Sequence, residues 1–273
     1  VPVLHSNRGY MLFVNSMYGA WFDFGKKTPH RFSLDFNGPV ADFFVFAGTP
    51  KENLKSYTDL TGHSIIPPKW AFQYWMGGGA PAWQVDNRDF KDVLQEYIDG
   101  YAAMGIHHVA ACYGEGGPSK NKEGYEIAAK SGMRMLIWNH PSQGIEFAKK
   151  VLGTDDMNEL PFLMPKGRKK TCLAINCTNW LDFTHPNAKK VLRAFYKEYF
   201  SWGLKGAMID FGEFVTPDAL LYNGKPGNAM HNEHSYWYAK TMKEVFDEGA
   251  NGDYILFQRS GCAGSQAFAG QFG

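Results

Sequence analysis

Asp210, Trp138 and Arg259 each stand at the end of a short apolar run that is typical of a β-strand. In a parallel barrel the catalytic side chains project from the carboxyl ends of the strands, so these three would meet at one rim. Together they would supply a carboxylate, a cation that keeps it ionised and an aromatic wall, a combination suited to attack on a sugar. The alternative is that Asp210 only caps the segment that follows, because Asp is favoured at helix N-caps.

Metal binding has weaker support in the sequence. The pair His107-His108 and the run His231-Asn232-Glu233-His234 contain candidate ligands, but neither has the HExxH spacing, and neighbouring strand residues point to opposite faces. The cysteines form no CxxC pair and fit no zinc template, so we expect buried thiols at Cys112, Cys172, Cys177 and Cys262. We therefore predict no metal site.

Composition excludes several classes of protein. The 273 residues include 28 Lys and Arg against 27 Asp and Glu, a net charge of +1, without the basic stripe that a nucleic-acid partner requires. No apolar run approaches the roughly 18 residues of a membrane-spanning helix. A hydrophobic content of 44% predicts a globular chain, and the 16% aromatic content suits a barrel core or stacking on sugar rings. Because the chain begins at Val1 rather than Met, we expect the natural N-terminus and any signal peptide to lie outside it; compartment and oligomeric state stay open.

Two patterns of residues divide the chain near Pro67-Pro68. Before this point, aromatic-rich runs separated by turn residues predict antiparallel strands at 10–14, 20–24, 31–36 and 42–46, followed by a short helix at 52–60. After it, predicted strands (70–75, 107–112, 134–138, 206–210, 254–258) alternate with predicted helices (89–104, 124–130, 186–202, 233–248). We expect an α/β fold, with a β-rich unit and linker over 1–66 and a parallel sheet or barrel over 67–273.

Five segments, in this order and over nearly the whole chain, resemble those of glycoside hydrolase family 31. They are IPPKWAFQYW (66–75), LDFTHP (181–186), GLKGAMIDFGE (203–213), MHN (230–232) and QRSGCAGSQ (258–266). The resemblance implies a (β/α)8 TIM barrel, cut here after about its fifth strand, preceded by the last part of an antiparallel β-sandwich. It also implies retaining hydrolysis of an α-linked carbohydrate through a covalent glycosyl-enzyme intermediate, with no metal or organic cofactor.

The resemblance assigns roles to individual residues. Asp210 matches the nucleophile, Arg259 the arginine that contacts the sugar, and Glu213 an acidic residue that orients the site; His231 belongs to the MHN motif and is counted as substrate-binding. The general acid of the family is an Asp after a Gly at the end of strand six. We expect it beyond Gly273, so that this chain alone would not hydrolyse α-glycosides.

The identity of the sugar is a separate question. The motifs look more like the branch with α-xylosidases and sulfoquinovosidases than like the starch-acting α-glucosidases. Gluco-specific members usually carry aspartates at the end of strand two, where this chain reads VAACYGE (109–115). A galacto-configured or N-acetylgalactosamine sugar is therefore a hypothesis, with Tyr113, Glu115 and Trp75 as replacement contacts beside Trp138.

Several alternatives remain open. Trp75 and Tyr113 could simply fill the barrel, because buried aromatic side chains dominate cores. The protein could be an α-glucosidase, α-xylosidase or sulfoquinovosidase of the same family, or a catalytically inactive glycan-binding relative, since fold does not fix function. A metal-dependent barrel hydrolase is the third possibility.

Overall fold

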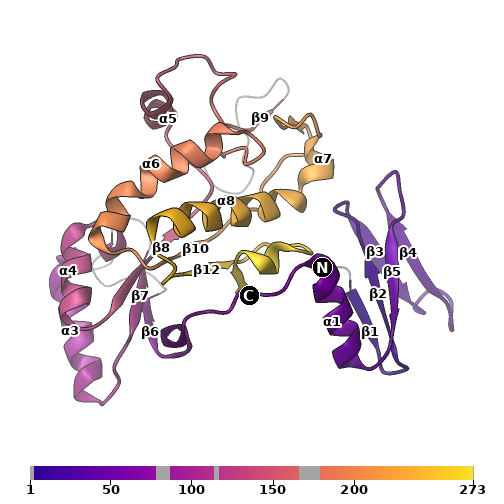
Figure 1. Cartoon of the computed structure of the whole chain (residues 1–273), viewed down its shortest axis with the longest axis horizontal. Coiled ribbons are helices and arrows are strands. Elements are labelled where there is room, and N and C mark those ends of the chain that lie inside the picture. The colour runs from indigo at the N-terminus through magenta and orange to yellow at the C-terminus, as the bar shows by residue number, and fades with distance from the viewer. Residues whose placement is uncertain (1–2, 78–86, 114–116, 166–178, 273) are drawn as a thin grey trace.

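The computed structural model describes residues 3–77, 87–113, 117–165 and 179–272 (Figure 1). Its N-terminal part is antiparallel: one sheet has the order β1 (Val3–Ser6), β2 (Tyr10–Val14), β5 (Phe43–Ala47), and β3 (Ala20–Phe24) pairs with β4 (Phe32–Phe36). Alternation in β2 buries Met11 and Phe13 on one face. The Phe13 ring meets the edge of Tyr57 on the following helix, with the ring centroids 5.2 Å apart, so this helix covers the sheet.

That helix is α1 (Pro50–Thr61), and local signals set both of its ends. Thr49 and Glu52 form a reciprocal capping box, and Pro50 occupies the first turn. Gly62 ends the helix with a φ of +103°, a conformation that a side chain disfavours. The helix that we predicted at 52–60 is therefore confirmed and is slightly longer.

The larger part of the chain is a parallel sheet whose strands follow one another in chain order, as they do in a TIM barrel. The described strands are β6 (Trp75–Gly77), β7 (Ala110–Tyr113), β8 (Arg134–Asn139), β10 (Gly206–Ile209), β12 (Ile255–Gln258) and β13 (Gly270–Gln271). Helices cover one face (Figure 1): α3 (Phe90–Ala103), α4 (Lys122–Lys130), α5 (Ile145–Leu152), α6 (Asn187–Trp202) and α8 (Glu233–Gly249). This is an incomplete (β/α)8 barrel preceded by antiparallel sheets, and β13 goes beyond the five strands that we predicted.

Short elements complete the described part of the chain. They are the 3₁₀ turns η1 (Lys69–Phe72), η2 (Pro118–Lys120) and η3 (Ser265–Ala267), the antiparallel pair β9 (Met164–Pro165) and β11 (Ala219–Leu220), and the helix α7 (Gly227–Met230). None of the described helices is long and apolar enough to cross a membrane.

The two faces of the parallel sheet bury different side chains. Alternate residues such as Met135, Ile137 and Ile209 pack against the helices in the main core. The residues between them, such as Leu136 and Phe257, face the interior of the barrel. Because successive strand residues point to opposite faces, this division also decides which side chains at the strand ends can reach a site in the barrel.

One predicted strand was wrong. The run 70–75 forms the 3₁₀ turn η1 first, and the strand covers Trp75–Gly77. The turn buries Trp70 beneath the barrel, where its indole N–H donates to Asp253 Oδ1 (2.8 Å) and the Arg134 guanidinium lies 5.0 Å from its ring. The first part of the run 70–75 is therefore not a strand, and it packs against the amino ends of the barrel strands.

Close packing at the centre of the sheet requires a glycine. A Cβ at Gly206 would lie 2.4 Å from Ile255 O and 2.8 Å from Leu136 Cδ2. Both distances are shorter than real Cβ contacts, so β10 approaches its neighbours only because position 206 lacks a side chain. This strand carries Asp210 directly after its last residue.

Candidate active site

Asp210 follows β10 on the barrel-facing side and is almost fully buried, with 6% of its surface exposed. Its Oδ1 accepts a hydrogen bond from the backbone N–H of Phe211 (2.9 Å) and forms an ion pair with Arg259 Nε (3.0 Å). Its Oδ2 accepts one hydrogen bond, from the indole Nε1 of Trp138 (3.1 Å). The three residues that stood at predicted strand ends are therefore in direct contact.

Arg259 joins two carboxylates. While its Nε binds Asp210, one terminal nitrogen donates to Glu213 Oε1 at 2.7 Å. Its guanidinium carbon lies 4.5 Å from the centroid of the Phe211 ring, within the range of a cation–π contact. The planar fork of arginine suits this double role, whereas a lysine would offer only a point charge.

A sharp turn after β10 brings Glu213 back toward Arg259. Phe211 has a φ of +59°, in the left-handed region that a bulky side chain rarely adopts. Gly212 is tightly enclosed, because a Cβ there would lie 2.8 Å from Ser260 Oγ and 3.3 Å from the Cα of Ser235. Strained backbone of this kind persists where the surroundings hold it, and here it lies beside the candidate nucleophile.

An aromatic wall stands beside the carboxylate. Trp138 meets the edge of Phe211 (centroids 6.0 Å apart) and of His140 (5.5 Å). The indole is partly exposed and shares the barrel-facing side of the strands with Asp210. Such a surface can stack against the apolar face of a sugar ring.

A polar cavity of about 470 Å³ adjoins Arg259 and Glu213. His231 also lines it, exposed to solvent, with Nδ1 3.4 Å from Val215 O. The remaining lining residues are Asn232, Ser235, Ser260, Gly261 and Gln271. The structure therefore gathers Asp210, Trp138, Arg259, Glu213 and His231 in one region.

Other predicted contacts lie elsewhere. Trp75 is at the beginning of the sheet, where it packs against Trp70 and Phe257 (centroids 6.0 and 5.5 Å away). Tyr113 belongs to the core between the sheet and the helices. Burial raises the pKa of its hydroxyl far above the ordinary value. Glu115 lies outside the described residues.

His234 is a residue of this region that we considered only as a metal ligand. It is fully buried in the first turn of α8, with Nδ1 2.8 Å from Gly212 O and Nε2 3.0 Å from Leu181 O. Burial lowers its pKa, against the opposing effect of the two carbonyl oxygens. The ring therefore supports the turn that carries Glu213. Across the described ranges, no three His, Cys, Asp or Glu side chains gather as metal ligands.

Asn139 was also missed as a supporting residue. Its backbone oxygen accepts the N–H of Asp210 (2.9 Å), and its side-chain Nδ2 donates to the hydroxyl of Tyr196 on α6 (2.7 Å). Its position directly after Trp138 at a strand end was the available signal, because an amide facing a helical core needs a partner there.

Two of the four predicted thiols can be placed. Cys262 is buried as expected, and burial raises its pKa to about 11. Cys112 is partly exposed, yet burial of its sulfur raises its pKa to about 12. Cys172 and Cys177 lie outside the described residues. A thiol with so high a pKa is a poor nucleophile, so neither Cys112 nor Cys262 is a candidate for the attacking group.

Comparison with known proteins agrees with this fold. The α-xylosidase XylQ of Lactiplantibacillus pentosus is 25% identical over 284 residues, which cover 95% of this chain and 36% of XylQ. The sulfoquinovosidase of Escherichia coli (strain K12) is 35% identical over 94 residues, 33% of this chain and 13% of that protein. The solved cycloalternan-forming enzyme of Listeria monocytogenes superposes with a TM-score of 0.76 at 20% identity, over 98% of this chain and 29% of that one.

The chain spans about a third of the length of the first curated relatives that it matches. A sequence model of the TIM-barrel domain of glycosyl hydrolases family 31 matches residues 64–273, more than three quarters of the chain. The chain, with its parallel strands, the turn at Asp210 and the contact of Arg259 with Asp210, therefore belongs to glycosyl hydrolase family 31.

Proposed function

We propose that the protein is a retaining α-glycoside hydrolase in which Asp210 is the nucleophile. The observation that carries this proposal is the unequal bonding of the two Asp210 oxygens. Oδ1 accepts a hydrogen bond from the Phe211 N–H and forms an ion pair with Arg259, whereas among the described residues Oδ2 has one partner, Trp138. An ionised carboxylate oxygen can accept about two such bonds, so Oδ2 keeps a lone pair for attack.

In the first step, Oδ2 forms a bond to the anomeric carbon while the bond from that carbon to the leaving oxygen breaks. The leaving oxygen takes a proton from a general acid. The result is a glycosyl ester in which Oδ1 becomes the carbonyl oxygen. It remains within reach of two donors, the Phe211 N–H and Arg259 Nε.

In the second step, water attacks the anomeric carbon and gives a proton to the conjugate base of the general acid, while the ester bond to Oδ2 breaks and restores the carboxylate. The same two donors at Oδ1 stabilise the carboxylate as it leaves, because they bind the charge that returns to it. Two inversions at the anomeric carbon give net retention of configuration.

The general acid is proposed to lie outside residues 1–273. A retaining pair needs two carboxyl groups about 5 to 5.5 Å apart across the scissile bond. Glu213 is joined to the same guanidinium as Asp210 and is positioned by it. This makes Glu213 a supporting residue in the proposal rather than the proton donor.

For the sugar, we propose a galacto-configured or N-acetylgalactosaminyl α-glycoside, from the absence of aspartate in the run 109–115. Trp138 is the proposed stacking residue, and Glu115 a proposed polar contact. The positions of Trp75 and Tyr113 favour packing roles for both. The names of the curated relatives, an α-xylosidase and a sulfoquinovosidase among them, supply the competing substrates.

The test is to assay the full-length protein on nitrophenyl α-glycosides of glucose, xylose, galactose, N-acetylgalactosamine and sulfoquinovose. We expect hydrolysis whose first product is the α-anomer of the sugar, as monitored by NMR. A fluorosugar inactivator should leave its label on Asp210. A label on another carboxylate would contradict the assignment, and an α-glucoside as clearly the best substrate would contradict the proposed sugar.

A further inference from the structure

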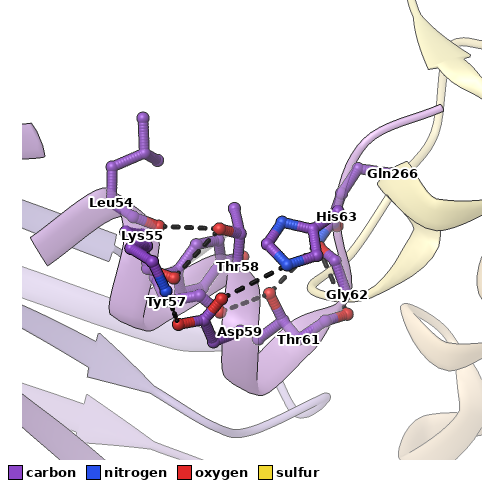
Figure 2. A network of polar contacts seen from close by, with 9 residues as sticks. All are labelled: Leu54, Lys55, Tyr57, Thr58, Asp59, Thr61, Gly62, His63 and Gln266. Carbon is purple, nitrogen blue, oxygen red and sulfur yellow. Dashed lines mark hydrogen bonds and ion pairs between the residues drawn. The ribbon is translucent and has the colours of Figure 1, made fainter. Parts of the chain in front are cut away.

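A side-chain amide joins the two parts of the chain. Gln266 lies in η3, after β12, and its Nε2 donates to Gly62 O (2.8 Å) and to Thr61 Oγ1 (3.0 Å) at the end of α1 (Figure 2). Its Oε1 accepts the N–H of Gly264 (2.9 Å), and its backbone oxygen accepts the N–H of Ile65 (3.1 Å). Both ends of the amide are therefore engaged.

The end of α1 offers acceptors that need a donor. The last carbonyl groups of a helix have no partner within the helix, and the last turn of α1 contains no basic side chain. The Thr61 hydroxyl donates to Tyr57 O (2.8 Å), so its oxygen is left to accept from Gln266. The nearby contacts of Asp59 with Lys55 and His63 are more exposed to solvent and do not cross the junction (Figure 2).

The backbones fit closely at this junction. A Cβ at Gly264 would lie 3.2 Å from the Tyr236 ring and 3.4 Å from Thr61 O. A Cβ at Gly62 would lie 3.1 Å from the Cβ of Ala267. Both glycines have positive φ angles, +96° and +103°. The N-terminal part therefore rests directly on the segment that follows β12.

This segment, residues 260–267, begins next to Arg259 and is internally bonded. Ser265 is 2% exposed; its hydroxyl donates to Cys262 O (2.8 Å) and accepts the N–H of Cys262 (3.1 Å). A second contact lies nearby, where Asn232 Nδ2 donates to Met17 O (2.9 Å). A small cavity of about 100 Å³ is enclosed between residues 13–17 and 261–263. The N-terminal part thus contacts the barrel at two places, through this segment and through Asn232.

We propose that Gln266 is a positioning residue for the nucleophile. By fixing segment 260–267 on the end of α1, it sets the direction of the Arg259 guanidinium, which in turn holds Asp210 and Glu213. A misplacement of about 1 Å at reacting groups can cost about 100-fold in rate, so a modest shift of this segment matters. The inference rests on the proposed function, because turnover reports the position of Asp210.

The test compares Gln266→Leu and Gln266→Glu with the wild type in the full-length protein, on the best α-glycoside of the panel. We expect Gln266→Leu to lower kcat about tenfold with a change in KM below about twofold, because the proposed stacking surface of Trp138 lies on another strand and stays in place while Arg259 and the nucleophile shift. Assays are run well below the melting temperature of each variant. A purely structural role would lower the melting temperature and leave kcat unchanged.

Gln266→Glu adds a pH signature. The ionised carboxylate has no hydrogen to donate to Gly62 O, whereas the protonated acid is similar in shape to the amide and can donate. The kcat of this variant relative to wild type should therefore rise as the pH falls. For Gln266→Leu the same ratio should stay flat, because leucine does not titrate.

Two further variants complete the design. Thr61→Val removes the hydroxyl that accepts from Gln266, together with its bond to Tyr57 O within α1, and should lower kcat about threefold. It decides the question if Gln266→Leu fails to fold. Gln95→Leu breaks an exposed bond to Asp99 on α3 and should have no effect. If the wild type hydrolyses no α-glycoside, the proposed function fails and the inference with it. If the wild type is active and the Gln266 and Thr61 variants keep its kcat, only the inference is overturned.

Discussion

The indole of Trp138 and the carboxylate of Asp210 come from neighbouring parallel strands, and the hydrogen bond between Trp138 Nε1 and Asp210 Oδ2 is 3.1 Å long. The bond reaches the oxygen that has a free lone pair, while the other oxygen is occupied by Phe211 and Arg259. In the proposed mechanism, Trp138 therefore orients the attacking oxygen and also offers a surface for stacking.

Replacing Trp138 with phenylalanine separates these two roles. The ring of Trp138→Phe would keep the stacking surface, but Oδ2 would lose its donor. Hydrogen bonds to charged groups contribute about 1.5 to 3 kcal/mol, so we expect kcat to fall about tenfold or more with KM little changed. Trp237→Phe is the matched control. It removes a hydrogen bond of similar length (3.0 Å), from the indole N–H of Trp237 to Glu233, which lies away from Asp210 on α8. Equal effects from both variants would contradict the proposed role.

Arg259→Lys tests the double ion pair. Lysine keeps the positive charge but cannot bind Asp210 and Glu213 in the same fixed geometry. We expect kcat to fall about tenfold to 100-fold, with a larger loss for Arg259→Met, which removes the charge as well. Steady-state kinetics of both variants would measure this. Wild-type kcat in Arg259→Lys would show that charge alone is sufficient.

Asp210→Ala should abolish turnover and leave the fold intact, because the side chain faces the interior of the barrel rather than the helical core. The expected loss is roughly 1,000-fold or more, as for other covalent nucleophiles. Added azide should restore part of the rate by attacking from the vacated side, which gives a β-glycosyl azide. An α-glycosyl azide would instead indicate that Asp210 is the acid.

His234 should make the fold sensitive to acid. Burial holds its pKa below the value of about 6.5 that it has in an unfolded chain. Below about pH 6.5 the unfolded state then binds a proton that the folded state does not bind. The free energy of unfolding therefore falls as the pH drops, by at most about 1.4 kcal/mol per pH unit. The loss continues until the pH reaches the lowered pKa of the folded state.

Urea unfolding of the full-length protein at several pH values measures this effect. His234→Gln keeps one donor and does not titrate, so its stability should depend less on pH between about 6.5 and 5. The exposed His107→Gln should leave the pH dependence as in the wild type. An unchanged slope in His234→Gln would show that another group is responsible.

The sequence predicted those parts of the fold in which local pattern and tertiary structure agree. Pro186 and the stripe beginning at Ala188 placed the helix that the structure has at Asn187–Trp202, and the same stripe is buried at Val191 and Leu192. We predicted that Trp138, Asp210 and Arg259 would lie close together because the carboxyl ends of parallel strands meet at one edge of the sheet.

Where the pattern was ambiguous, the sequence could not decide. The residues around Tyr113 are uniformly small and apolar, so no alternation showed that the tyrosine faces the helices and not the barrel. We did not predict the short helix Ile145–Leu152, because it lies between Gly144 and Gly153 and offers only two turns of periodicity. The role of Gln266 depends on Thr61 and Gly62, about two hundred residues earlier, which only the folded chain brings near.

Consecutive residues at three neighbouring strand ends divide between the two faces of the sheet. Trp138, Asp210 and Arg259 face the barrel, and Asn139, Ile209 and Gln258 face the helices. Inserting or deleting one codon within any of these strands would exchange its two faces; in β12, for example, Gln258 would enter the site and the charge of Arg259 would enter the core. We therefore expect changes of length to be tolerated in the loops between these strands and not within them, so that the strands can diverge only by substitution.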